Sequence, residues 1–385
     1  MQDTTESPTQ SPPVSITFNN KTVPYQTTNI TVDRAQFGNN SVTGDEFVVV
    51  IHNATGEQYS SEIGPPIGES KVLVGGQQTK ISVDLSRTLA EEDSVTQLTG
   101  TQPLIAVVYS VNTSDDTTNY GEPIIRNGTS VTDRAQIAAP QRGTKANPYE
   151  ISNISELQAM EDDLNANYEL VSDIDASDTA QWNNGRGFEP IGDSSTGFTG
   201  SFDGNGYTIT GLTVDRPDEN QIGPFGINKG KITDLSLIDV TVTGDEQVGG
   251  LAGSNAEAEI QNVTVSGSVS GESQVGGLTG ENSGTVRNAK AEASVVGDGF
   301  DVGGLIGDNN RGRIRNATAA GSVSGGDNVG GLIGENIGTI RVLTASGTVA
   351  GDRNVGGLVG QHNDGTLQNA AAFGSVTGDS SVGGV

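Results

Sequence analysis

Apolar residues recur with a fixed period over residues 248–381. Five consecutive copies of one phrase run 27, 27, 27, 26 and 27 residues, and each opens with Val-Gly-Gly-Leu, one variable residue and Gly. The copies begin at Val248, Val275, Val302, Val329 and Val355. Two further apolar columns are Ile260, Val286, Ile314, Ile340 and Leu367, and Val269, Val295, Val323, Val349 and Val376. A period in this range indicates a solenoid or another stacked array.

Within a copy, apolar residues lie two positions apart, as in Val263 and Val265 or Ala317 and Ala319. This is the period of a strand with one buried face. The glycines and β-branched residues of every copy disfavour a helix. Because one copy cannot bury its own apolar face, we expect the copies to stack as a parallel β-helix that rises about 4.8 Å per coil.

A polar column accompanies the apolar ones at a second turn of each copy. It reads Asn255, Asn282, Asn309 and Asn336, with His362 in the last copy. Stacked asparagine amides form hydrogen bonds from one layer to the next. The column therefore predicts a structural ladder of side chains along the solenoid.

The chain divides into five segments. Residues 1–13 are a flexible Ser/Thr/Pro-rich start, 14–139 a β-sandwich domain, 140–146 a linker, 147–221 a capping helix with irregular first coils, and 222–385 the repeats. Short apolar runs between turn signals, such as residues 47–52, indicate the sandwich. Ser155, with Gln158 three residues on, predicts the start of the helix that covers the first coil. The predicted fold is all-β, a β-sandwich followed by a parallel β-helix with one short capping helix.

The charge balance limits the choice of partners. The chain has 48 acidic and 20 basic residues, a net charge of −28, and no cysteine. Such a charge disfavours binding to nucleic acid and to anionic membranes, and it is typical of proteins that stay soluble in molar salt. Disulfides and thiolate metal sites are excluded. No apolar run reaches the ~18 residues of a membrane span.

Sequons for N-glycosylation are frequent, which favours an exported protein and an extracellular or cell-surface location. The candidates are Asn20, Asn29, Asn39, Asn53, Asn112, Asn127, Asn153, Asn262 and Asn316.

Acidic residues recur at one turn of the copies. They are Asp245, Glu272, Asp298, Asp301, Asp327, Asp352 and Asp379. Carboxylates stacked one rung apart repel by roughly 1 kcal/mol per pair even in water. Two interpretations are open, screening by salt or weakly held Ca²⁺ between coils. No other cofactor is expected.

No catalytic constellation is visible. The two histidines, His52 and His362, lie far apart in the sequence, and the outward positions of the repeats hold small residues. Five aromatic residues precede the repeats and could stack on a sugar or fill the core, namely Trp182, Phe188, Phe198, Phe202 and Tyr207. We expect a protein that is not an enzyme.

The copies resemble the GLUG motif of secreted and surface proteins in bacteria and haloarchaea. The resemblance rests on Gly250-Leu251-Ala252-Gly253 and its four equivalents, which are Gly277-Leu278-Thr279-Gly280, Gly304-Leu305-Ile306-Gly307, Gly331-Leu332-Ile333-Gly334 and Gly357-Leu358-Val359-Gly360. Residues 14–139, from Ile16-Thr17-Phe18 to Val131-Thr132-Asp133-Arg134-Ala135, resemble a haloarchaeal exported domain of unknown function. These resemblances imply a β-helical surface protein and no particular activity.

The predicted function is that of an extracellular structural or adhesion protein, in which a β-helical stalk presents a β-sandwich. The alternative is a carbohydrate-binding or carbohydrate-cleaving β-helix protein. Expected partners are other surface proteins, glycans or copies of the chain itself. Since the last copy breaks off at Val385, we expect that the protein continues or that its open edge meets a partner, as in a filament.

Overall fold

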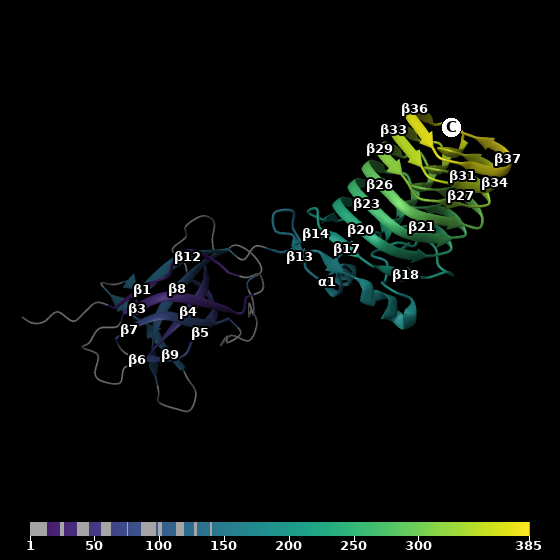
Figure 1. Ribbon diagram of the computed structural model, residues 1–385. Coiled ribbons are helices and arrows are strands. Elements are labelled where there is room, and N and C mark those ends of the chain that lie inside the picture. The colour runs from purple at the N-terminus through teal and green to yellow at the C-terminus, as the bar shows by residue number, and fades with distance from the viewer. Residues whose placement is uncertain are drawn as a thin grey trace, which may run out of the picture. The chain divides into compact units, whose positions relative to one another are not determined.

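The computed structural model describes residues 14–23, 27–36, 46–54, 63–74, 76–85, 98, 102–112, 119–126, 129–138 and 141–384. The chain divides into two compact units, Met1–Arg142 and Gly143–Val385 (Figure 1). This division lies inside the segment that the sequence predicts as a linker. Each unit is described by itself.

The described strands of the first unit form one ten-stranded sheet that is antiparallel apart from its last pair. In order across the sheet they are β1 (Ser15–Thr17), β3 (Asn29–Gln36), β7 (Gln77–Asp84), β5 (Ile63–Ser70), β4 (Glu46–Ala54), β8 (Gln102–Asn112), β12 (Thr132–Ala138) and β2 (Lys21–Thr22), with β6 (Leu73–Val74) on β4 and β9 (Asn119–Pro123) on β8. A separate hairpin pairs β10 (Ile125–Arg126) with β11 (Thr129–Ser130).

This sheet is a half-barrel, where the sequence predicts two packed sheets. It curls so that β1 contacts β8 and β12, and the amide of Phe18 donates to the Asp133 carboxylate at 2.7 Å. The concave face holds a core that includes Val49, Leu104 and Val108. Alternating apolar positions show that one face of the sheet is buried. A half-barrel and a sandwich of two sheets bury that same face, so the pattern alone does not choose between these two folds.

The second unit is a β-solenoid of about seven turns, which confirms the predicted parallel β-helix (Figure 1). Its irregular first part contains β13 (Tyr149–Ile151), α1 (Ile154–Gln158), the 3-10 helices η1 (Ala159–Asp162) and η2 (Ser177–Gly185), β14 (Asn167–Leu170), β15 (Ile174–Asp175), β16 (Ser201–Asp203), β17 (Thr208–Thr210) and β18 (Thr213–Asp215).

Two parallel sheets run along the repeats. The larger holds β20 (Lys231–Thr243), β21 (Glu246–Gly249), β23 (Glu259–Gly271), β24 (Ser273–Gly276), β26 (Thr285–Gly297), β27 (Phe300–Gly303), β29 (Arg313–Ala319), β30 (Val323–Ser324), β31 (Asp327–Gly330), β33 (Thr339–Ser346), β34 (Val349–Gly356), β36 (Thr366–Phe373) and β37 (Val376–Gly383). The smaller holds β19 (Phe225–Asn228), β22 (Ala252–Asn255), β25 (Thr279–Asn282), β28 (Ile306–Asn309), β32 (Ile333–Asn336) and β35 (Val359–His362).

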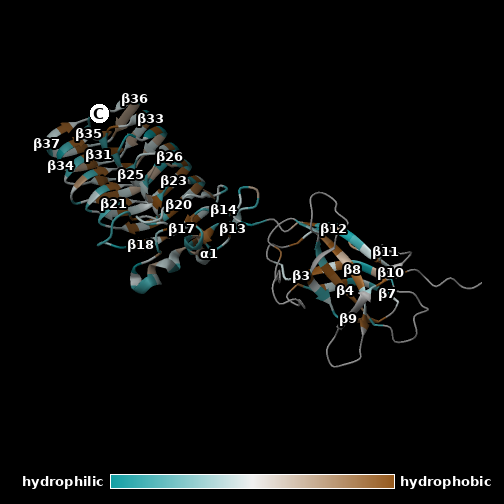
Figure 2. Ribbon diagram, turned by 180° about the vertical axis from the view of Figure 1, so that it is seen from behind, coloured by the Kyte–Doolittle hydropathy of each residue, from teal (hydrophilic) through white to brown (hydrophobic). Residues whose placement is uncertain are grey.

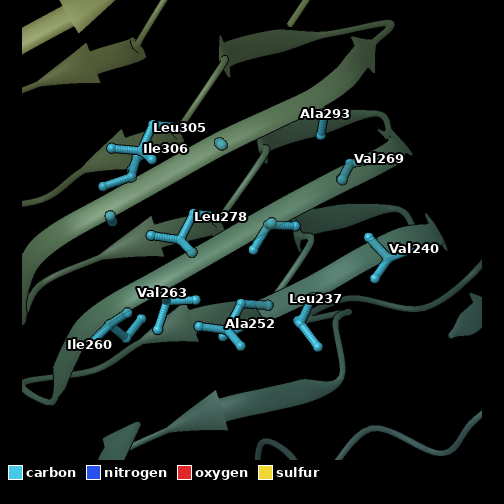
Figure 3. Packing of buried hydrophobic residues seen from close by; sticks show 14 of the residues in the cluster. Leu237, Val240, Ala252, Ile260, Val263, Val269, Leu278, Ala293, Leu305 and Ile306 are labelled. Carbon is cyan, nitrogen blue, oxygen red and sulfur yellow. The ribbon is translucent and has the colours of Figure 1, made fainter. Parts of the chain in front are cut away.

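The apolar columns stack in register, as predicted. Val275 pairs with Val302, and Val286 pairs with Ile314. In Figure 3 the side chains of Leu278 and Leu305 lie one above the other in the interior, and both are fully buried. Hydrophobic and hydrophilic positions intermingle along the stacked strands in Figure 2. The core is thus continuous from coil to coil.

The glycines of the repeated phrase lie where the backbones of the coil approach closely. A Cβ atom on Gly303 would lie 2.0 Å from the carbonyl oxygen of Ile306, and one on Gly307 would lie 2.5 Å from the carbonyl carbon of Gln274. Both contacts are with backbone, so no side chain can move aside. The Val-Gly-Gly-Leu-x-Gly phrase is therefore a packing requirement of the coil.

The helix that precedes the first coils begins two residues before the predicted position. Asn153 is its N-cap and accepts from the amide of Glu156 at 3.0 Å, while the Glu156 carboxylate accepts from the amide of Ser152 at 2.7 Å. The predicted cap at Ser155 is wrong, because Ser155 lies inside the helix. Leu157 is buried, as is Met160 in the following 3-10 turn.

Candidate functional site

An inner ladder of amides runs along the solenoid through the last residue of each short strand of the smaller sheet. Nδ2 of each asparagine donates to Oδ1 of the next, at 2.8 Å for Asn255 to Asn282 and for Asn282 to Asn309, and at 2.6 Å for Asn309 to Asn336. The ladder starts at Asn228 and ends where Nδ2 of Asn336 meets Nδ1 of His362 at 2.9 Å. All five linked asparagines are fully buried, and the predicted ladder is confirmed.

A second, outer ladder was not predicted. Nδ2 of Asn262 donates to Asp234, Asn288 to Asn262 and Asn316 to Asn288, each at 2.8 Å. These residues have φ between 51° and 56°, in the left-handed region that asparagine and aspartate tolerate. In the next coil the same position holds Val342, with φ 59°, which interrupts the ladder.

The sequons of the second unit lie at structural positions. Asn262 and Asn316 belong to the outer ladder, and their Nδ2 atoms, to which an N-glycan would be attached, donate hydrogen bonds. Asn153 caps the helix. Glycosylation at these asparagines stays a prediction.

The sequons of the first unit are differently placed. Asn20 and Asn29 are exposed, Asn53 lies in β4, and Asn112 is the last residue of β8. Asn39 and Asn127 lie outside the described residues. These sites too stay predictions.

The seven acidic residues proposed for Ca²⁺ do not form one column, and several of them lie in strands rather than in a shared turn. Asp245 stacks on Glu272, and Asp352 is aligned with Asp379. Between these two pairs the same position holds two glycines. The amide of Gly299 donates to the carbonyl of Glu272, and the carbonyl of Gly326 accepts from the amide of Asp352. Asp298 is an extra residue beside Gly299.

The remaining two members of that set have partners. The Asp327 carboxylate binds the guanidinium of Arg353, which lowers the pKa of Asp327. Asp301 is 3% exposed and accepts from Asn328 at 2.9 Å. In the described part of the chain no three acidic or histidine side chains are grouped so that they could hold a metal ion. Binding of Ca²⁺ therefore stays a prediction.

Asp301 lies beside a column of carboxyl groups that the sequence analysis missed. Glu281, Asp308 and Glu335 stack in register on β25, β28 and β32. Burial raises the pKa of Asp301 to about 6. Burial, together with the charges of Asp301, Glu335 and Glu281, raises the pKa of Asp308 to about 7. The signal was available, because an acidic residue precedes the ladder asparagine in three consecutive copies.

Amide side chains of adjacent coils hold this carboxyl column. Gln247 donates to Glu281 at 2.7 Å, Gln274 to Asp308 at 3.3 Å and Asn363 to Glu335 at 2.7 Å. Each bond joins residues 28 or 34 positions apart. These hydrogen bonds connect the carboxyl column to side chains of other coils.

The histidines and aromatic residues do not assemble one site. His52, in the first unit, hydrogen-bonds Tyr109 at 3.1 Å, whereas His362 ends the inner ladder of the second unit. The predicted aromatic residues Phe188, Phe198 and Phe202 are buried in the core. Trp182 and Tyr207 are partly buried and pack against the same core.

Comparison with known proteins agrees with this architecture. Residues 244–270 match the family described as the GLUG motif. The chain carries the GLUG motif. It is 40% identical over 137 residues to halomucin of Haloquadratum walsbyi, and 40% identical over 138 residues to a protein of Evansella cellulosilytica named as a Gly-rich membrane protein.

These matches cover about a third of this chain, 32% and 34%, but only 2% and 16% of the two relatives. The GLUG chain therefore corresponds to a small part of each relative. Within the residues that the structure describes, no helix is long and apolar enough to cross a membrane.

Proposed function

We propose that this chain is an extracellular, surface-associated structural protein whose GLUG solenoid is a scaffold rather than a catalytic framework. The observation that carries the proposal is that the inward-facing side chains, apolar and amide, hold adjacent coils together. Apolar columns fill the interior, and amide ladders join each coil to the next. Such a quasi-one-dimensional stack is suited to spacing and display.

The named relatives support a surface location for the GLUG chain. One is named halomucin and the other is named as a membrane protein, and neither name states an enzymatic activity. The net charge of −28 supports a setting of high salt, in which self-repulsion is screened. Adhesion and self-assembly, through glycans, other surface proteins or copies of the chain, belong to the same proposal.

Protease treatment of intact cells that make the chain tests the proposed location. We expect added protease to cut the chain while a cytoplasmic marker in the same cells stays whole. If the chain is cut only after the cells are lysed, the surface assignment fails. Sedimentation of the purified chain over a concentration series then tests self-assembly separately.

A further inference from the structure

Five of the 20 basic residues of this acidic chain gather on one outer face of the solenoid. Strands β26, β29 and β33 hold five basic residues and a single acidic one. The basic residues are Arg287, Lys290, Arg313, Arg315 and Arg341, all of them exposed. The acidic residue, Glu292, is paired with Lys290 at 2.7 Å. This face is therefore locally cationic although the chain carries a charge of −28.

Three of these arginines form a row along the solenoid. Arg287 pairs in register with Arg315, and Arg315 with Arg341, so that they follow one another at the strand spacing of about 4.8 Å. Among the described residues no carboxylate is paired with any of the three. In contrast, Lys231 and Arg353 elsewhere on the solenoid each face an acidic partner.

Stability of the coil does not account for this arginine row. Like charges opposed on neighbouring strands are destabilising. The same position holds Gln261 in the coil before the row and Gln368 in the coil after it. A neutral side chain is thus compatible with the coil, and the row of charges calls for another explanation.

The arginine row borders an open depression of ≈ 430 Å³. It is lined by Gln261, Arg287, Asn288, Arg315, Asn316 and Val342. Asn288 and Asn316 are members of the outer ladder, and Nδ2 of each donates one hydrogen bond within it. Because a side-chain amide has two N–H groups, each retains one donor for a ligand hydroxyl.

Val342 adds a second unusual feature to the depression. It is 46% exposed and adopts φ 59°, a conformation that is costly for a β-branched residue. Asparagine or aspartate takes this conformation in the equivalent positions of the other coils, at residues 234, 262, 288, 316 and 369. Strain without a packing gain is characteristic of functional surfaces.

We propose that this face binds a linear polyanion, an acidic polysaccharide that carries carboxylate or sulfate groups along its chain. The planar guanidinium groups of Arg287, Arg315 and Arg341 present paired donors that match such oxyanions. A row that follows the solenoid fits a polymer, and the acidic surface elsewhere confines the polymer to this face. The inference goes beyond the proposed scaffold role and does not depend on it.

Titration of the full chain with three polymers tests the polysaccharide site. The probes are polygalacturonate, dextran sulfate and neutral dextran, measured by calorimetry at low and at high NaCl. We expect one or both charged polymers to bind, with an affinity that falls as salt rises, and dextran not to bind. The charged polymer that binds more tightly identifies carboxylate or sulfate as the preferred group.

Substitution of the middle arginine locates the site. Arg315→Gln should weaken binding roughly tenfold, the loss of one charge-assisted contact, and replacing Arg287 and Arg341 by Gln as well should abolish it. Arg353→Gln removes one charge elsewhere and should leave binding unchanged. Because Gln261 and Gln368 already occupy this column, the variants should fold, which circular dichroism verifies.

Three outcomes would overturn the polysaccharide site. One is equal binding of neutral dextran, and another is unchanged binding by the Arg315→Gln chain. The third is the failure of both charged polymers to bind. If in that case the parent chain self-associates and Arg315→Gln does not, the face belongs to a contact with the acidic surface of a second copy.

Discussion

Individual buried amides join each coil of the solenoid to the next. Each buried asparagine after the first one, Asn228, donates to one neighbouring coil and accepts from the other, so that its two bonds extend the stack in both directions. A buried amide that loses its partner keeps the cost of its desolvation. The inner ladder is therefore more sensitive to substitution than the outer one.

Asn309→Ala should lower the free energy of unfolding by about 1–3 kcal/mol, because it leaves Nδ2 of Asn282 buried without a partner. Oδ1 of Asn336 also loses one donor but keeps the amide of Gly338. Asn288→Gly is the matched control in the exposed outer ladder, where glycine tolerates the positive φ, and it should cost less than about 1 kcal/mol. Denaturant unfolding measures both. Equal losses would contradict the distinction between the two ladders.

The carboxyl column gives the solenoid a pH dependence of definite sign. The pKa of Asp308 is raised from 3.8 to about 7. Between these values the folded chain holds a proton that the unfolded chain releases, so stability falls as pH rises from about 4 to about 7. Above this range the loss is complete.

Asp308→Asn should therefore stabilise the chain at pH 8 and have little effect at pH 4. We expect about 2 kcal/mol, half of what the full shift implies, because solvent screens the partly exposed carboxyl group. The carbonyl oxygen of the new side chain can still accept from Gln274. Asp298→Asn, at an exposed turn, controls for the change in net charge. Thermal unfolding of the parent chain and both variants from pH 4 to pH 8 is the measurement. If Asp308→Asn stabilises the chain by the same amount at pH 4 and at pH 8, the pKa of Asp308 is not raised.

At the residue scale, the sequence predicts what repeats with the same residue type. The inner ladder could be foreseen because Asn255, Asn282 and Asn309 are identical. The raised pKa values could not, because they depend on how deeply Asp301 and Asp308 are buried and on carboxylates from other coils. The predicted column of acidic residues is interrupted in the structure by Gly299 and Gly326. Counting positions from the start of each copy does not reveal this interruption.

At the scale of elements, strands and their register follow from the apolar columns. Period-two alternation identifies the buried face of β23, β26 and β33, and the nearly equal copy lengths indicate their pairing. The sequence determines less well where a helix begins and how a sheet curls. Asn153 and Ser155 are both good cap residues, and only the extended backbone of Asn153, with φ −151°, decides between them. The curl of the first unit into a half-barrel likewise depends on contacts between distant strands.

Val342 is the residue of strand β33 that interrupts the outer ladder. Val342→Asn should raise the free energy of unfolding by about 1–2 kcal/mol, because it relieves the left-handed strain of a β-branched residue and restores the outer ladder beside Asn316. Val342→Thr is polar but remains β-branched, and it should give no comparable gain. If the two variants are equally stable in denaturant titrations, strain at this position is not what limits the coil.

At the scale of the whole molecule, the chain combines a half-barrel with a solenoid whose coils contact mainly their neighbours. Repeat proteins of this kind sum their stability over interfaces between adjacent units. Each GLUG copy forms one coil and lies directly on the copy before it. From this follow the amide ladders, the carboxyl column and the arginine row.

Engineered cysteines test this stacking most directly, because the chain has no cysteine of its own. The hydroxyls of Ser294 and Ser322, in adjacent coils, are 2.9 Å apart. Ser268 pairs in register with Ser294, so it lies two coils from Ser322, at roughly 9.6 Å, beyond the reach of a disulfide. All three side chains are exposed.

Mild oxidation at low protein concentration, followed by titration of free thiols, is the measurement. We expect the Ser294→Cys/Ser322→Cys chain to close an intramolecular disulfide, whereas the Ser268→Cys/Ser322→Cys chain should keep both thiols. If the two double variants oxidise equally, or if the second oxidises first, successive copies do not stack one coil per repeat.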